Sequence, residues 1–365
     1  MRTRYLALVV ALCALLAGSV AYTLLGLGVF ARYRLANADF ATTCDDTLAW
    51  SPPQQIFTGF YPNQPSLLTL RFRSATPALL RVSVSIPGFT QEQSVTEEAG
   101  PTYRAQAFKP PLLGAAALDA LVGPRQRAAQ LRVSIQNEQR GGQTVCDTSA
   151  PVTLLSRQWM RWSDPATGDN APYLAGWVTP QASVITDLVG QVAARIALAP
   201  QNYDNLPALY GYDQGQASAD AVRAQVNAIF DTLQFTYHLR YAADTILYGQ
   251  DASQLIQLPK DVLSSPAPTG MCVETTVIMA AAVERLGMRP FIVLVPGHAF
   301  LGVALGANPG APLAYWETSD LNGGIDGAQA NVHGGMEYNS YQDQGTTPRL
   351  IDVVAERQRG INPME

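Results

Sequence analysis

Three stretches in the first half of the chain alternate hydrophobic and polar residues. Residues 68–73, 80–86 and 131–135 each carry a hydrophobic side chain at every second position, which is the period of a half-buried β-strand. Turn-forming pairs, Pro87-Gly88 and Gly141-Gly142 among them, separate these stretches. This part of the chain is therefore expected to form β-sheets with one face turned to solvent.

The spacing of these strands and turns is typical of an immunoglobulin-like β-sandwich, which we place at residues 39–157. Cys44 and Cys146 stand near the two ends of this region. Their positions predict a disulfide, although two free thiols in a cytosolic domain would leave the same signature. A disulfide implies an oxidising compartment, so the body of the protein is expected to be extracytoplasmic, in a periplasm or at a cell surface.

Ahead of the β-region, the segment from Tyr5 to Phe30 contains no charged residue. A helix of this length exceeds the hydrocarbon thickness of a bilayer, about 30 Å. Residues 1–36 are therefore expected to be a transmembrane anchor, which makes the membrane a partner. A cleaved signal segment is the alternative, because Ala36-Asn37-Ala38 could serve as a cleavage site, although the apolar run is long for a signal.

The second half of the chain, residues 158–365, mixes helical and strand patterns and predicts an α+β domain. Ser218 can cap a helix whose apolar stripe runs from Val222 to Leu233. A further apolar helix is expected to begin at Cys272 and to end at Gly287, which supplies a C-terminal stop.

Cys272 stands where a cysteine becomes a nucleophile. The unpaired N–H groups and the positive dipole end of a helix N-terminus favour thiolate. An apolar strand over residues 291–295 follows, and Pro296-Gly297 then turns the chain into a strand that begins at His298, a candidate base. A lone Cys is most often a small buried residue and a lone His an ordinary core or surface group, so the inference depends on their joint occurrence in this order.

Two carboxylates, Glu317 and Asp320, follow on the next expected strand and could orient the imidazole. In an antiparallel hairpin, a pairing centred on Pro309 sets His298 opposite Asp320. A shift of that centre by one residue moves the partner to Thr318. Simple hairpin geometry thus favours Asp320 over Glu317.

The Gly-x-Cys-x-Glu helix start, the Gly-His-Ala-Phe strand and the Trp-Glu-Thr strand end resemble the transglutaminase-like superfamily of papain-type cysteine enzymes, in particular its bacterial extracytoplasmic branch. The resemblance covers roughly the last half of the chain. It implies that Cys272 is the nucleophile, His298 the base and Glu317 the third member of a triad. The family usually has Asp in that third place, so Asp320 stays open as the alternative acid. Gln257 could donate to an oxyanion beside the Cys272 N–H, or it could be a plain structural amide.

Composition narrows the function further. With 47% hydrophobic and 15% charged residues, the chain has the make-up of a packed globular protein, and its net charge of −5 argues against nucleic acid as a partner. The sequence has no Cys-x-x-Cys, no His-Glu-x-x-His and no phosphate-binding glycine motif. We therefore expect no metal and no cofactor. His333 lies in a Gly-, Asn- and Gln-rich tail and is expected to be a loop residue.

These features together predict a membrane-anchored, extracytoplasmic enzyme that performs cysteine-dependent acyl transfer on a protein or peptide substrate. Water as the acceptor would make it a peptidase or amidase, and an amine would make it a crosslinking, transglutaminase-like enzyme. Cleft shape and water exclusion decide between these acceptors. The alternative is a catalytically inactive transglutaminase-like scaffold or binding protein of the cell envelope.

Overall fold

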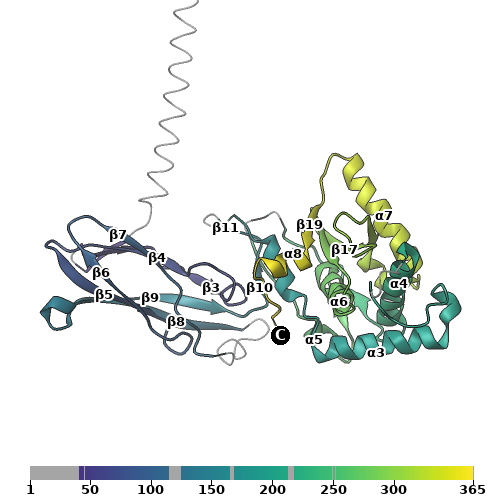
Figure 1. The fold of residues 1–365 in the computed structure, drawn as a ribbon, viewed down its shortest axis with the longest axis horizontal. Coiled ribbons are helices and arrows are strands. Elements are labelled where there is room, and N and C mark those ends of the chain that lie inside the picture. The colour runs from purple at the N-terminus through teal and green to yellow at the C-terminus, as the bar shows by residue number, and fades with distance from the viewer. Residues whose placement is uncertain are drawn as a thin grey trace, which may run out of the picture. The chain divides into compact units, whose positions relative to one another are not determined.

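The computed structural model describes residues 41–44, 46–114, 125–164, 168–212, 218–248, 250 and 252–364. The chain divides into two compact units, and Figure 1 labels helices and strands of both. The first unit comprises Met1–Pro53, Ser66–Pro111 and Gln130–Ala150, and the second comprises Gln54–Pro65, Leu112–Ala129 and Pro151–Glu365. The division is thus less simple than the single boundary near residue 157 that the sequence suggested.

The first unit is built from β-strands, as the alternating pattern predicts. One sheet has the order β1-β2-β4-β7 and consists of β1 (Ala41–Thr43), β2 (Leu48–Trp50), β4 (Leu68–Phe72) and β7 (Arg104–Phe108). A second sheet has the order β3-β9-β8-β5-β6 and consists of β3 (Gln55–Phe57), β5 (Ala78–Ser85), β6 (Gln93–Ala99), β8 (Gln126–Asn137) and β9 (Gln143–Leu155), with η1 (Glu138–Arg140) between the last two. Of this sheet, β3, the first residues of β8 and the last residues of β9 fall in the residue ranges of the second unit. The hydrophobic residues of β4 are buried, whereas Thr69 between them is exposed. The period of two in the sequence therefore identifies the face that packs into the core.

A disulfide joins Cys44, just after β1, to Cys146 in β9. This is the pairing expected from the sequence. The two cysteines are 102 residues apart in the chain, and a cross-link that closes so long a loop removes much of the entropy of the unfolded state, a stabilisation of roughly 2–5 kcal/mol. Cys272 is a free, buried thiol.

The fold class expected from the sequence needs correction at its N-terminal end. It included a membrane helix within residues 1–36, but in the part of the chain that the structure describes no helix is both long and apolar enough to cross a bilayer. A spanning helix needs about 20 apolar residues, and none of the described α-helices has more than 17 residues. The expected apolar segment, Tyr5 to Phe30, lies outside the described residues. The fold that the structure shows is mixed α+β.

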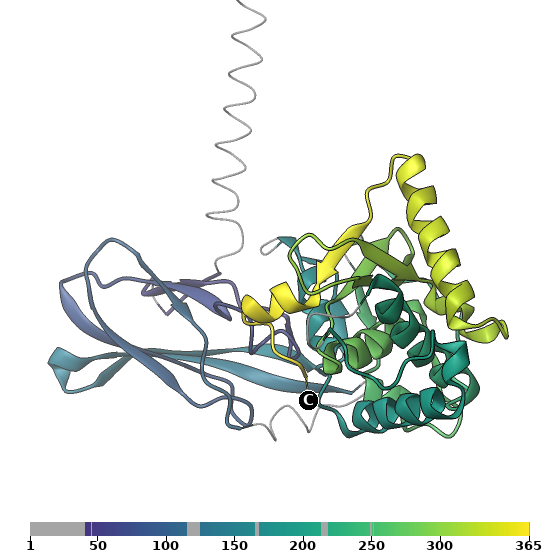
Figure 2. The ribbon, with the colours of Figure 1, turned by 45° about the vertical axis from the view of Figure 1, so that its right-hand side comes forward.

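The second unit centres on an antiparallel sheet of order β18-β17-β16-β19 (Figure 2). Its strands are β16 (Pro290–Val295), β17 (His298–Ala304), β18 (Leu313–Trp316) and β19 (Arg349–Asp352). The α-helices are α3 (Ser183–Leu198), α4 (Ala219–Phe235), α5 (Pro259–Leu263), α6 (Cys272–Arg285), α7 (Gly327–Asp343) and α8 (Val353–Gln358), and the 3-10 helices are η2 (Ala171–Trp177), η3 (Pro200–Asn202) and η5 (Thr318–Asn322). Short strand pairs complete the unit: β10 (Trp159–Arg161) with β14 (Ser253–Leu255), β11 (Ser163–Asp164) with β12 (Gly168–Asp169), and β13 (Arg240–Tyr241) with β15 (Thr269–Gly270).

Helix α6 forms the centre of this core. Every residue from Cys272 to Val283 is buried, because α6 packs against β16 and β17 and also against α3, α4 and α5. A helix that is apolar on all sides suits such a position. The predicted ends of the helices also hold: Ser218 accepts a hydrogen bond from the Ala221 N–H at the start of α4, and Gly287 follows α6 with a left-handed φ of 74°.

Helix α7 was not foreseen, and the prediction that His333 lies in a loop is wrong. The sequence of α7 is poor in strong helix formers, so tertiary contacts must supply the stability of this helix. Asp326 caps its first turn, and Gly334 lets it lie directly on β18. A Cβ atom at Gly334 would stand 2.7 Å from the backbone nitrogen of Trp316.

Candidate active site

Cys272 is the first residue of α6 and is fully buried. The turn that carries it is fixed by Glu274, whose Oε2 accepts the Met271 N–H at 2.9 Å and whose Oε1 accepts the Gln257 N–H at 2.7 Å. Burial raises the pKa of Glu274, and these backbone hydrogen bonds work against that rise. Glu274 therefore has the structural role, at the helix start, that its first-turn position suggests.

Gln257 belongs to the same network. Its side-chain amide nitrogen lies 3.4 Å from Glu274 Oε2, so this amide helps to hold the segment between β14 and α5 to the start of α6. Its use as an oxyanion donor stays a prediction.

His298 begins β17 directly after a tight turn. Val295 and His298 are paired across β16 and β17, and Gly297 between them has a φ of 77°, which is the left-handed conformation that glycine adopts without strain. The turn therefore fixes the imidazole at the end of the hairpin, where its side chain is 17% exposed.

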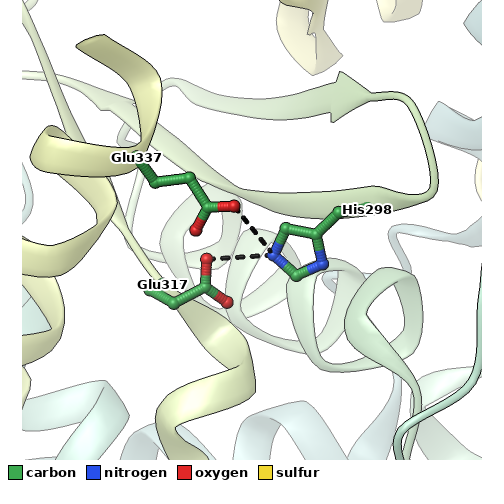
Figure 3. Close-up of side chains that lie close together, drawn as sticks. All are labelled: His298, Glu317 and Glu337. Carbon is green, nitrogen blue, oxygen red and sulfur yellow. Dashed lines mark hydrogen bonds and ion pairs between the residues drawn. The ribbon is translucent and has the colours of Figure 1, made fainter. Parts of the chain in front are cut away.

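The imidazole has a close partner in Glu317. Its Nε2 lies 2.9 Å from Oε2 of Glu317 (Figure 3). Burial alone would lower the pKa of His298, but hydrogen bonds with the side chains of Cys272 and Glu317, and their charges, raise that pKa to about 10. The site thus favours imidazolium, the form that stabilises a neighbouring thiolate.

Glu317 is placed by the turn that follows β18. It is the N-cap of η5, where Oε1 accepts the Ser319 N–H at 2.7 Å while Oε2 faces His298. Burial would raise its pKa, yet the hydrogen bonds from His298 and from Glu337 hold that pKa well below its usual range. Glu317 is therefore the ionised acid beside the imidazole.

The next residue, Thr318, ties this acid to the cysteine helix. Its hydroxyl lies 3.0 Å from the hydroxyls of both Thr275 and Thr276 in the first turns of α6. It also lies 3.3 Å from the Cys272 carbonyl oxygen, to which it donates. All three threonines are fully buried, so the acid and the nucleophile are held on one rigid support.

The hairpin register differs from both pairings considered from the sequence. Leu301 pairs with Trp316 and Ala304 with Leu313, which is one residue away from either alternative. The ladder also stops at Trp316, where the chain turns into η5. Glu317 therefore reaches His298 through a helix cap and not as a cross-strand neighbour.

Asp320, the alternative acid, is engaged elsewhere. Its Oδ2 lies 2.8 Å from Nδ1 of His333 on α7. Burial raises the pKa of Asp320, and the hydrogen bond and charge of His333 oppose that rise. The structure thus forms two separate acid and imidazole pairs, His298 with Glu317 and His333 with Asp320.

Glu337 is a site residue that the sequence reasoning missed. It projects from α7, and its Oε1 lies 3.8 Å from His298 Nε2 (Figure 3). Burial, together with the hydrogen bond to Glu317 and the negative charge there, raises the pKa of Glu337 to about 8. This raised pKa favours the protonated carboxyl of Glu337 at neutral pH, the form that can donate a hydrogen bond to the Glu317 carboxylate. No local signal marks it, since only the docking of α7 on β18 brings it to the site.

His298, Glu317 and Glu337 are also the residues that could hold a metal ion, because one ligand atom of each lies within 4.8 Å of the others. Nitrogen and carboxylate oxygen suit Zn²⁺ and related cations. Hydrogen bonds already pair these atoms: His298 donates to Glu317, and Glu337 shares its proton with Glu317. The close carboxylates therefore do not require a cation.

Comparisons with protein-family models, with curated proteins and with solved structures found no match. The geometry of the site itself therefore carries the functional inference.

Proposed function

We propose that the second unit is a transglutaminase-like cysteine enzyme that transfers acyl groups from protein or peptide carboxamides. The observation that supports this is the 2.9 Å contact between His298 Nε2 and the Glu317 carboxylate, together with the effect of the Cys272 side chain on the pKa of His298. Such an arrangement of nucleophile, base and acid is the working unit of cysteine acyl transfer.

The chemistry follows from this order. The Cys272 thiolate attacks the carbonyl carbon and forms a carbon–sulfur bond, and the imidazolium of His298 gives its proton to the leaving amine. Water or an amine then attacks the thioester, His298 takes the acceptor's proton, and the thiolate leaves. Glu317 holds the imidazole in one orientation and stabilises its positive charge.

The surroundings of the site suit an ion pair between the Cys272 thiolate and the His298 imidazolium. Tyr241 of β13 pairs with Gly270, two residues before Cys272, and burial and then the charges of Cys272 and Glu317 raise its pKa. Because Cys272 is fully buried, a substrate carbonyl must displace covering side chains as it enters. Exclusion of water strengthens the electrostatic interactions among the reacting groups.

The disulfide between Cys44 and Cys146 supports an oxidising compartment as the place of action, because such bonds persist outside the reducing cytosol. We therefore propose an extracytoplasmic protein or peptide as the substrate.

The test is the reactivity of Cys272 toward iodoacetamide in the full-length protein at pH 7. We expect it to exceed the rate of the same thiol in urea-unfolded protein, to vanish in Cys272→Ala, and to fall about tenfold or more in His298→Ala. EDTA should leave the rate unchanged, because no step uses a metal. A folded rate below the unfolded one that His298→Ala does not alter would rule out the enzyme and favour an inactive scaffold that keeps the fold.

A further inference from the structure

A polar pocket of about 500 Å³ lies in the second unit beside the candidate triad, lined by Gln234, His238, Leu239, Arg240, Leu321 and Gly324. We propose that this pocket is a substrate subsite for a carboxylate-bearing peptide, a proposal that rests on the acyl-transfer function proposed above. It adds to that function the class of side chain or terminus that the enzyme accepts.

Gln234 supplies a hydrogen-bond acceptor that has no partner. The residue is 8% exposed, and its Oε1 is buried without a hydrogen bond in the described structure. The amide orientation is fixed, because Nε2 donates to the Ile325 carbonyl oxygen and a flipped amide would put two acceptors together. An unpaired buried carbonyl oxygen is unfavourable, and because this oxygen has almost no exposed area, a ligand N–H or O–H group reaches it only when a neighbouring side chain moves.

Arg240 and His238 supply the complementary donors. Both are exposed, and within the described part of the chain the side chains of both are without an ion pair or hydrogen bond, although the Arg240 backbone N–H donates to Pro268. A guanidinium presents its donors in a fork that matches a carboxylate. The pocket thus offers a cation for a carboxylate, the group that an acidic peptide residue or a peptide C-terminus carries.

The pocket stands close to the reacting groups. In β13, Arg240 pairs with Thr269 and Tyr241 with Gly270, and Thr269 precedes Cys272 by three residues, a chain distance of at most roughly 11 Å. On the opposite wall, Leu321 belongs to η5, the helix that Glu317 caps. An extended peptide whose scissile carbonyl meets Cys272 can therefore place a neighbouring residue in the pocket.

The negative charge around the site explains why a substrate carboxylate would need the Arg240 guanidinium. The triad region holds the carboxylates of Glu317 and Asp320, and the chain as a whole has a net charge of −5. An acidic substrate would be repelled by this surrounding unless a local positive group met its carboxylate. Arg240 is placed to supply that group.

The test measures peptide binding to the full chain carrying Cys272→Ala, so that no turnover is required. The probes are fluorescent, N-acetylated hexapeptide amides with either Glu or Gln at the third position, and a third probe keeps Gln but ends in a free carboxylate. We expect the Glu peptide to bind about tenfold more tightly than the Gln peptide. A preference for the third probe instead identifies the C-terminal carboxylate as the group recognised.

Variants assign the effect to the pocket. Arg240→Ala should reduce the carboxylate preference to less than about twofold, and Arg240→Lys should keep part of it, since Lys retains the charge but loses the fork. Arg223→Ala is the matched control, because Arg223 pairs with Asp220 on the surface of α4. No measurable binding, equal binding of all three peptides, or a preference that survives Arg240→Ala would overturn the proposal. Iodoacetamide reactivity of Cys272, measured in parallel on protein that keeps this cysteine, keeps a failure of the catalytic function distinct from a failure of the pocket.

Discussion

The Glu317 carboxylate lies 2.9 Å from His298 Nε2, although the two residues do not face one another across the β17–β18 ladder. The contact is made by an N-cap: one carboxylate oxygen holds the Ser319 N–H and the other is left for the imidazole. A single side chain therefore starts a helical turn and orients the candidate base.

The two contacts of Glu317 allow an experiment that distinguishes Glu317 from Asp320 as the acid that orients His298. In Glu317→Gln the amide oxygen can still cap η5, but the negative charge that stabilises imidazolium is gone. We expect the iodoacetamide rate of Cys272 at pH 7 to fall about tenfold or more. Asp320→Asn should change it less than about threefold, since Asp320 faces His333. A larger effect from Asp320→Asn would reassign the acid.

Glu337 gives the molecule a pH-dependent stability. Burial and the Glu317 hydrogen bond raise the pKa of Glu337 from its ordinary 4.5 to about 8. The folded protein holds this proton more tightly than the unfolded chain, so stability is lost as the pH rises from about 4.5 to about 8. Glu337→Gln keeps an N–H donor and removes the titration.

Urea unfolding at a series of pH values tests this. The unfolding free energy of the wild type should fall relative to that of Glu337→Gln across the window from about 4.5 to about 8. The raised pKa of His298 adds a loss of the same sign in both proteins, which the comparison removes. Parallel pH curves for the two proteins would show that Glu337 does not carry the proton.

Two neighbouring glycines of α7 form a matched pair. A Cβ at Gly334 would meet the backbone of β18 at 2.7 Å, whereas a Cβ at Gly335 would meet nothing within 4 Å. Gly334→Ala should destabilise the protein by about 1–3 kcal/mol through overpacking. Gly335→Ala should be neutral or stabilise by up to about 1 kcal/mol, because alanine is the better helix former. Equal effects in urea unfolding would argue against the close docking of α7.

The disulfide makes a prediction about the native protein. Peptide mapping without reduction should find Cys44 linked to Cys146. Removal of the bond in Cys44→Ala should lower the unfolding free energy by about 2–5 kcal/mol. Recovery of both cysteines as freely alkylated thiols from the native compartment would contradict the bond and the oxidising location with it.

The sequence by itself determined the elements whose signals are local. The period of two in residues 68–73 marks β4, Ser218 caps α4, and the Pro296-Gly297 turn sets His298 at the start of β17. Cys272 at a helix start is visible for the same reason. Such features depend on residues a few positions apart, whose backbone preferences act before any tertiary contact forms.

The tertiary structure alone decided the rest of the site. The β17–β18 register differs from both expected pairings. The pattern of β17 could not fix it, because the strand is buried on both faces and lacks the alternation that excludes a one-residue slip. Helix α7 and Glu337 were invisible because a Gly- and Asn-rich segment has little helix propensity of its own. It becomes a helix where Gly334 allows close packing on β18, and that packing, not the local sequence, places the proton of Glu337 beside the triad.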